Sequence, residues 1–238
     1  MQLITFGSSS KGNTYVLQGK TSALVIEAGV DFLTVHKKVD YDLICGCVVT
    51  HRHNDHCKYI GQYMSQCVPV YALEDVFQAK EASGRYAKAI TPGEKFKVGE
   101  FQIYPFAANH DVPCVGFIIY HPECGKVLFL TDTFMSEYTF SGLNQIIVEC
   151  NYSEAILREC SDYLVMRKRL MYSHMELKTT KALLSANDLS LVQNIVLVHL
   201  SDGHSHERHF KAEIEELTEK RVTVADRGRT IDFNLNPY

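Results

Sequence analysis

The chain has 238 residues, an apolar content of 46% and a formal net charge of −4. This length suits one domain or at most two small ones, and the negative charge means that a nucleic-acid partner requires a local basic patch. No apolar run approaches the roughly 18 residues of a membrane span, and the first residues lack the basic start and apolar core of a signal peptide. We therefore expect a cytoplasmic protein without membrane association.

Eight cysteines are present, mostly inside apolar runs, and no C-x-x-C pair argues for a separate zinc finger. Disulfide scaffolds are typical of short secreted chains. We therefore interpret these cysteines as buried thiols.

Short apolar, β-branched runs separated by Gly, Asn and Asp predict strands in the first half of the chain. These runs cover residues 2–6, 14–18, 23–27, 43–49 and 68–72. Two hairpins follow, over residues 95–106 with a turn at Gly99 and over residues 115–132 with a turn near Gly125. A helix is predicted over residues 57–67.

The second half alternates short apolar strands with helices. The strands cover residues 145–150 and 194–200, and the helices cover residues 153–170, 175–188 and 205–220, the last with Ser205 as its N-cap. No repeat or clear linker interrupts the pattern. It predicts one α/β domain over residues 1–238, with two sheets covered by helices.

The stretch VVTHRHNDHCKY, residues 48–59, follows an apolar strand and carries four ligand-type side chains. These are His51, His53, Asp55 and His56. Imidazole nitrogens and carboxylates are typical zinc ligands. Alternate residues His51 and His53 can point at one metal ion while Asp55 and His56 turn towards a second. A polar turn with chance histidines does not explain this density, so the motif predicts metal binding.

The H-x-H-x-D-H motif after a buried strand resembles the metallo-β-lactamase superfamily, whose fold is an αββα sandwich with two mixed sheets flanked by helices. Further motifs of that superfamily occur in order: His110 in AANHDVP, Asp132 in FLTDT and His199 in LVHLS. The resemblance implies that His51, His53 and His110 hold one ion, that Asp55, His56 and His199 hold the other, and that Asp132 bridges them.

One position departs from the superfamily pattern. An aspartate usually follows the second strand, as in LIDAG, whereas this chain has VIEAG with Glu27. The family aspartate supports the metal-binding loop, and we expect the longer carboxylate to do the same.

Asp132 favours the dinuclear phosphodiesterase branches, because lactamases typically lack this bridging aspartate. The 21 residues between His110 and Asp132 are too few for the tRNA-clamping arm of tRNase Z. The segments GSSSKGN at residues 7–13, THRHNDH, LTDT and VLVHLS together resemble the compact YycJ/WalJ/VicX-like group, which is associated with DNA exonuclease activity. The segment after His199 departs from that group at Asp202, Gly203, His204 and His206.

Two further residues are candidates for proton transfer. His174 in YSHMELK matches a histidine of tRNase Z-like enzymes that is not a metal ligand, and Glu149 in IIVEC matches its carboxylate partner. In such a pair the carboxylate orients the imidazole and keeps it protonated for a leaving oxygen. Two divalent ions would supply a bridging hydroxide that attacks phosphorus. The catalytic candidates are therefore Asp55, Glu149 and His174.

Three functions remain open from the sequence. The leading one is a DNA nuclease. The phosphates of its DNA substrate would contact basic residues such as Arg158, Lys178, Lys11 and the run 167–169. The second is a cyclic nucleotide phosphodiesterase of the phage anti-Pycsar type, with a closed pocket that a partner subunit of a homodimer completes. The third is a regulatory metal-binding module without turnover. The ligand types suit Zn²⁺ best, with Mn²⁺ or Fe²⁺ as alternatives.

Overall fold

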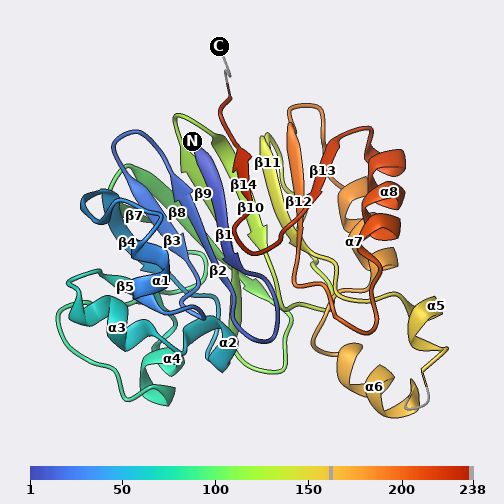
Figure 1. Cartoon of the computed structure of the whole chain (residues 1–238), viewed down its shortest axis with the longest axis horizontal. Coiled ribbons are helices and arrows are strands. Elements are labelled where there is room, and N and C mark those ends of the chain that lie inside the picture. Colours follow the sequence, from blue (N-terminus) through green and yellow to red (C-terminus); the bar gives the residue numbers. More distant parts are fainter. Residues whose placement is uncertain (161–162, 236–238) are drawn as a thin grey trace.

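The computed structural model describes residues 1–160 and 163–235. Within them, two seven-stranded sheets pack face to face, and helices cover the outer face of each (Figure 1). The predicted αββα sandwich is therefore confirmed.

The first sheet combines antiparallel strands from the N-terminus with a parallel half. Strands β3 to β6 run parallel, and the strands before them pair antiparallel. In spatial order the strands are β14 (Thr230–Asp232), β1 (Gln2–Gly7), β2 (Thr14–Gln18), β3 (Ala23–Ile26), β4 (Ile44–Val48), β5 (Val70–Ala72) and β6 (Ala87–Ala89).

The second sheet has the same mixed character. Strands β10 to β13 are parallel, and the two predicted hairpins supply the antiparallel half. In spatial order the strands are β13 (Arg221–Val224), β12 (Asn194–Val198), β11 (Gln145–Glu149), β10 (Gly125–Leu130), β9 (Cys114–His121), β8 (Phe101–Ala108) and β7 (Phe96–Val98).

Side-chain alternation divides the apolar residues into three layers. On β1, Leu3 points into the core between the sheets while Ile4 points to the outer face, as the two-residue period of a strand requires. Phe129 and Tyr15 meet edge to face inside the central core. The apolar clusters on the two outer faces are closed by helices.

The helices that cover the sheets lie in two groups, while two further helices within residues 154–170 pack against each other in a small cluster of their own. The first group covers the outer face of the first sheet, and α7 and α8 cover the outer face of the second beside β12 and β13 (Figure 1). In chain order they are α1 (Phe32–His36), the 3₁₀ turn η1 (Tyr41–Leu43), α2 (Asn54–Cys57), α3 (Ile60–Ser65), α4 (Glu74–Ala79), α5 (Glu154–Leu157), α6 (Tyr163–Leu170), α7 (Leu177–Ser185) and α8 (Glu207–Thr218).

Two helix predictions were wrong in detail. The segment 153–170 is not one helix, because α5 closes with short-range bonds from the Glu159 and Cys160 amides to the carbonyls three residues earlier. Ser205 is not the N-cap of α8. Its hydroxyl donates to the Ser201 carbonyl, and His206 caps the helix through the amide of His209.

Five of the cysteines are buried and all eight are free thiols, as their apolar surroundings indicated. Among the described residues, every helix falls short of the length and hydrophobicity that a bilayer-spanning segment needs.

Candidate metal centre

Four chemically important side chains follow the carboxyl ends of parallel strands. His51 lies just beyond β4, Asp132 beyond β10 and His199 beyond β12, while Glu149 is the last residue of β11. Strands β10, β11 and β12 are parallel neighbours in one sheet, so their carboxyl ends meet at one edge, and the segment after β4 of the other sheet lies beside that edge. The fold itself therefore brings these side chains together.

The histidine-rich loop forms in two steps. The chain leaves β4 in extended conformation through His51 to His53, which is the N-terminal boundary of α2. Asp55 and His56 lie on that helix. The rings of His51 and His56 remain in contact, with centroids 4.2 Å apart, while the two residues belong to different ligand groups.

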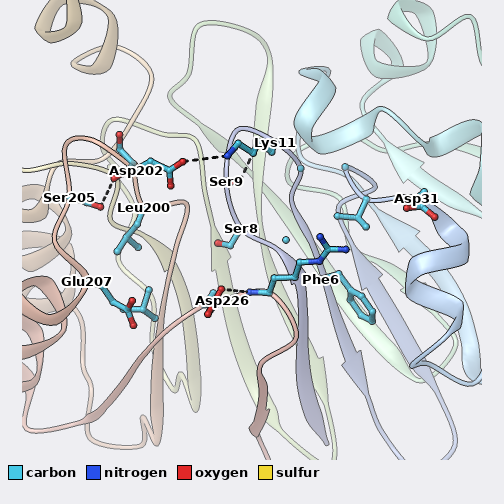
Figure 2. Close-up of a pocket in the computed structure, with 18 of the residues that line it drawn as sticks. Phe6, Ser8, Ser9, Lys11, Asp31, Leu200, Asp202, Ser205, Glu207 and Asp226 are labelled. Atoms are coloured by element: carbon cyan, nitrogen blue, oxygen red, sulfur yellow. Dashed lines mark hydrogen bonds and ion pairs between the residues drawn. The ribbon is translucent and has the colours of Figure 1, made fainter.

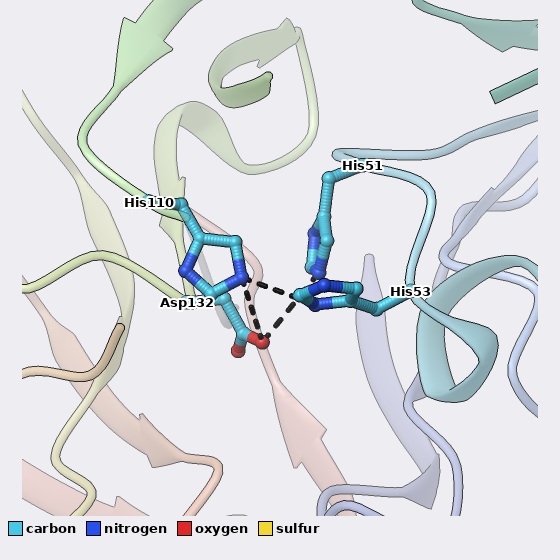
Figure 3. A group of neighbouring side chains, drawn as sticks. All are labelled: His51, His53, His110 and Asp132. Carbon is cyan, nitrogen blue, oxygen red and sulfur yellow. Dashed lines mark hydrogen bonds and ion pairs between the residues drawn. The ribbon is translucent and has the colours of Figure 1, made fainter. Parts of the chain in front are cut away.

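The side chains gather into two groups that share Asp132. Within each group the ligand-type atoms lie within 4.8 Å of one another. The first group contains His51, His53, His110 and Asp132, which Figure 3 shows converging on one point. The second contains Asp55, His56, Asp132 and His199. The structure therefore brings all seven residues of the sequence prediction together in these two groups.

Glu27 supports His51 and His56 on the side away from the cluster. Its carboxylate accepts a 2.6 Å hydrogen bond from the Thr50 hydroxyl, which lies 2.9 Å from Nδ1 of His51. The same carboxylate lies 3.3 Å from Nδ1 of His56. Such contacts fix the orientation of each ring and leave Nε2 to face the cluster. The expected role of Glu27 thus has a physical basis in these contacts.

The glycine-rich segment 7–13 contributes residues that the sequence reasoning did not assign. The side-chain amide of Asn13 donates to Oδ2 of Asp55 at 3.1 Å, and its backbone amide donates to the Asp55 carbonyl at 2.7 Å. The hydroxyl of Ser8 accepts from the amide of His199 at 2.9 Å. The only signal in the sequence was the group-specific GSSSKGN pattern, which indicated a turn but not these contacts.

Glycine is required at residue 29, where the chain passes between Asn13 and the helix α2. A Cβ atom on Gly29 would lie 1.7 Å from the carbonyl oxygen of Asp55. Gly29 also donates to the carbonyl of Asn13. The close approach of three backbones around Asp55 therefore excludes any side chain at residue 29.

Three non-glycine residues of the centre adopt left-handed backbone conformations. The φ angles are 66° at Glu27, 48° at Asp132 and 56° at His199. Each costs of order 1–3 kcal/mol and persists only when surrounding contacts impose it. All three directly follow a strand or lie one residue beyond it, where the chain must turn sharply to aim a side chain into the cluster.

The chemistry of the donor set fits divalent cations. Burial lowers the pKa of His51 well below its ordinary value, and its Nε2 is buried without a hydrogen-bond partner in the described part of the chain. An unprotonated imidazole nitrogen without a hydrogen-bond partner has a lone pair available to bind a metal ion. The neighbouring histidines hold the pKa of Asp132 well below its usual range despite its burial.

Glu149 and His174 form a pair beside the cluster. Nδ1 of His174 lies 2.7 Å from Oε1 of Glu149, and its ring stacks on His199 with a centroid distance of 5.2 Å. Burial alone would lower the pKa of His174, but the Glu149 carboxylate raises it. Asp132, Glu149, His174 and His199 also lie close enough to form a third ligand group, so geometry alone permits His174 to bind metal.

Comparison with known proteins identifies the family. Residues 23–200 match the family described as the beta-lactamase superfamily domain. The chain belongs to this superfamily. It is 23% identical over 234 residues to a protein named Exodeoxyribonuclease YycJ from Bacillus anthracis, with 90% of this chain and 88% of that protein covered. The resemblance to the YycJ-like group is thereby confirmed.

Solved structures of superfamily members share the whole architecture. The metallo-beta-lactamase fold protein YhfI from Bacillus subtilis has a TM-score of 0.72 at 17% identity, covering 97% of this chain and 99% of that chain. The short form of human tRNase Z has a TM-score of 0.66 at 15% identity, covering 98% and 99%. The protein is therefore a hydrolase of metallo-β-lactamase fold whose His and Asp clusters suit divalent metals.

A cleft of about 550 Å³ lies beside the metal centre of this superfamily member, between the segment 7–12 and the segments 200–207 and 224–227 (Figure 2). Its charges are mixed. Lys11 approaches Asp202 at 3.7 Å across the cleft, and Asp31, Glu207 and Asp226 add carboxylates. This cleft is therefore not a uniformly basic track.

Two of the predicted basic residues, Arg158 and Arg167, form ion pairs with one carboxylate. Nε of Arg167 lies 3.1 Å from Oε1 of Glu154, and Arg158 approaches the same oxygen at 3.4 Å. The Arg167 pair joins α5 to α6, whereas the Arg158 pair lies within α5 and its C-cap. Lys168 and Lys178 are exposed, and the side chain of Arg169 lies outside the described residues. Arg167 thus has a structural partner that the sequence did not reveal.

Protein purified without chelator should contain about two divalent ions per chain, because two ligand groups share one bridging carboxylate. His51→Ala should lower that content, since it removes a ligand whose lone pair faces the cluster. His36→Ala, which changes an exposed histidine outside the cluster, should retain both ions. Elemental analysis of the three proteins decides; metal contents near zero even after titration with Zn²⁺ or Mn²⁺ would contradict the assignment.

Glu27→Gln should weaken metal binding by about 10- to 100-fold, the usual effect of removing a group that orients ligating histidines. The amide can still meet the Thr50 hydroxyl but no longer places a negative charge beside His56. Glu100→Gln changes a surface carboxylate that contacts Thr21 and Ser22 instead, and it should bind metal as the wild type does. Competition with a coloured chelator measures both affinities. Equal affinities would show that Glu27 serves the fold alone.

Proposed function

We propose that this protein is a metal-dependent phosphodiesterase, most specifically a nuclease that degrades DNA in the manner of an exonuclease. The Glu149–His174 pair beside the two ligand groups carries the proposal, because cleavage of a nucleotide ester must protonate an alkoxide leaving group. The curated relative whose name is Exodeoxyribonuclease supports the choice of DNA. We assign the resident ions as zinc on ligand type, with manganese and iron as the alternatives.

The ligand set divides into holding and reacting residues. His51, His53 and His110 would hold one ion, Asp55, His56 and His199 the other, and Asp132 both. Bound there, a pair of divalent ions supplies Lewis acidity and an activated water for attack on phosphorus. Asp55 would hold an ion in the side-chain position that Asn13 and α2 impose on it.

His174 supplies the proton. Its Nδ1 engages Glu149, so the opposite nitrogen, Nε2, is turned away from that carboxylate, and the residue lines a pocket of about 220 Å³ next to His199. Burial alone would lower the pKa of His174, but the Glu149 carboxylate raises it and so favours the protonated ring. As the phosphorus–oxygen bond breaks, the Nε2 proton moves to the departing oxygen. Glu149 stabilises the imidazolium before transfer and fixes the plane of the ring throughout.

The same pocket admits substrate from the cleft side. It is lined by Ser9, Ser10 and the segment 199–204, and so shares a wall with the larger cleft of Figure 2. Hydroxyls and backbone amides there can contact phosphate without a fixed charge. A chain end can therefore approach His174 along this wall.

The direct test incubates zinc- or manganese-loaded protein with duplex DNA, single-stranded DNA, RNA and cyclic nucleotides. We expect DNA to be shortened from an end, with mononucleotides or short oligonucleotides as products. Preferential hydrolysis of cyclic nucleotides would replace the nuclease proposal with the signalling phosphodiesterase. If the metal-loaded protein cleaves none of the four substrates, the result would support a metal-binding regulatory module without turnover.

His174→Ala should keep both ions and the folded state but lose about 10²- to 10⁴-fold in the rate of DNA cleavage, the usual contribution of a positioned acid. The loss should shrink on bis-p-nitrophenyl phosphate, because p-nitrophenolate needs no proton to leave. Steady-state rates on the two substrates, with elemental analysis of the variant, make the comparison.

Two further variants separate an acid from a ligand. Glu149→Gln should show a milder form of the same pattern, and the double variant should be little worse than His174→Ala alone, because residues that act as one unit are not additive. If His174→Ala loses a metal ion, or slows both esters equally, then His174 is a metal ligand or a structural residue and the proton-transfer assignment is wrong.

A further inference from the structure

The helical cover of the second sheet stops short of its outer strands. The apolar cluster beneath α7 and α8 ends at Tyr104 and Ile118, which are only partly buried against it. Beyond them Tyr120, on β9, is 42% exposed. Tyr104 pairs with Ile118 across β8 and β9, so Tyr104 and Tyr120 lie diagonally, about 7–8 Å apart. Two tyrosines thus stand on an uncovered sheet face.

Lysines surround these tyrosines. Lys95, Lys97 and Lys126 line the same shallow hollow of about 300 Å³ as Tyr104 and Tyr120. Lys95 and Lys97 are exposed, and neither forms an ion pair with the residues that the structure describes. The Lys126 ammonium donates to the Ser141 carbonyl at 2.6 Å, which holds its charge at the rim.

Aromatic side chains continue along β8 from this hollow. Phe106 lies two residues beyond Tyr104 on β8, so both side chains point to the same face of the sheet. Tyr138 packs edge to face on Phe106 at 5.5 Å and is itself 46% exposed. Tyr138 belongs to the segment that begins at Asp132, the shared ligand of both metal groups. Tyr104 precedes His110 by six residues, about 20 Å of strand.

We propose that Tyr104, Tyr120 and the three lysines bind single-stranded nucleic acid, with bases stacked on the tyrosines and phosphates beside the lysines. Aromatic side chains on an open sheet face accept any base, since each has a π-face, and nearby cations follow the backbone. We call these five residues the tyrosine platform. The choice of polymer rests on the proposed nuclease function, whereas binding itself needs no turnover.

Protection of an exposed edge does not account for the whole arrangement. Lysines on an edge strand discourage pairing with other chains, and β7 is such an edge. Lys126, however, lies on β10, which is paired on both sides. Neither this interior lysine nor the two tyrosines contributes to blocking an edge.

Binding of metal-loaded protein to a fluorescent phosphorothioate oligothymidylate, followed by anisotropy, tests the platform. Tyr120→Ala should weaken binding by about 5- to 150-fold, as expected for one lost base stack, and Tyr120→Phe should stay near the wild type. Lys97→Glu should weaken binding and make the log–log salt dependence shallower by about 0.7. A thymidine dinucleotide, too short to span metal centre and platform, should bind all variants alike.

Lys88→Glu is the matched control, because Lys88 is an exposed lysine on β6, the edge strand of the other sheet. It should bind the oligonucleotide as the wild type does. Every variant should hydrolyse bis-p-nitrophenyl phosphate at the wild-type rate. Failure of the wild type on that ester and on DNA would count against the proposed function, while the binding data would still judge the platform.

Two results would overturn the platform. One is equal oligonucleotide affinity in Tyr120→Ala, Lys97→Glu and Lys88→Glu. The other is a dimer in sedimentation velocity that Tyr120→Ala dissociates without changing oligonucleotide affinity, which would make this face a contact between two copies of the chain.

Discussion

The buried carboxylate of Asp132 is the group on which the rest of the site depends. Its Oδ2 lies 3.2 Å from Nε2 of His56 and 3.6 Å from Nε2 of His51, and its Oδ1 lies 3.7 Å from Nε2 of His199. A carboxylate with 2% exposure is costly unless positive charge surrounds it. Its partners come from β4, α2 and β12, so the sandwich must hold several strand ends in fixed register around one oxygen pair.

The backbone meets this requirement with local conformations that cost free energy. Glu27, Asp132 and His199 all have positive φ, and Gly29 leaves no space for a side chain beside Asp55. The central core and the two helical layers must therefore supply the stability that the metal edge lacks. The segment 7–13 adds to this support, because its hydrogen bonds to Asp55 and His199 hold both residues in position.

Charge is distributed differently over the rest of the molecule. Two cations near the metal centre have a carboxylate partner, as Lys11 has Asp202 and Arg167 has Glu154. Lys95 and Lys97 have no ion-pair partner among the described residues, and they line the hollow on the uncovered face of the second sheet. A net charge of −4 thus conceals a local cationic surface. A polyanionic substrate would then be attracted by the lysine-lined hollow and cleaved at the metal centre, which itself carries carboxylates.

The sequence by itself determined the family, most strands, both hairpins and the seven residues of the two ligand groups that share Asp132. Strand alternation is local, and a dense run of imidazole and carboxylate groups has few uses other than metal binding. Only the tertiary structure decided that Asn13 and Ser8 hold Asp55 and His199 and that Arg167 is paired with Glu154. It also placed the predicted partners His174 and Glu149 2.7 Å apart. It also decided that tyrosines of β8 and β9 share a face with Lys126 of β10. These contacts depend on strand register and on the path of loops, which join residues too far apart in the chain for any local pattern to specify.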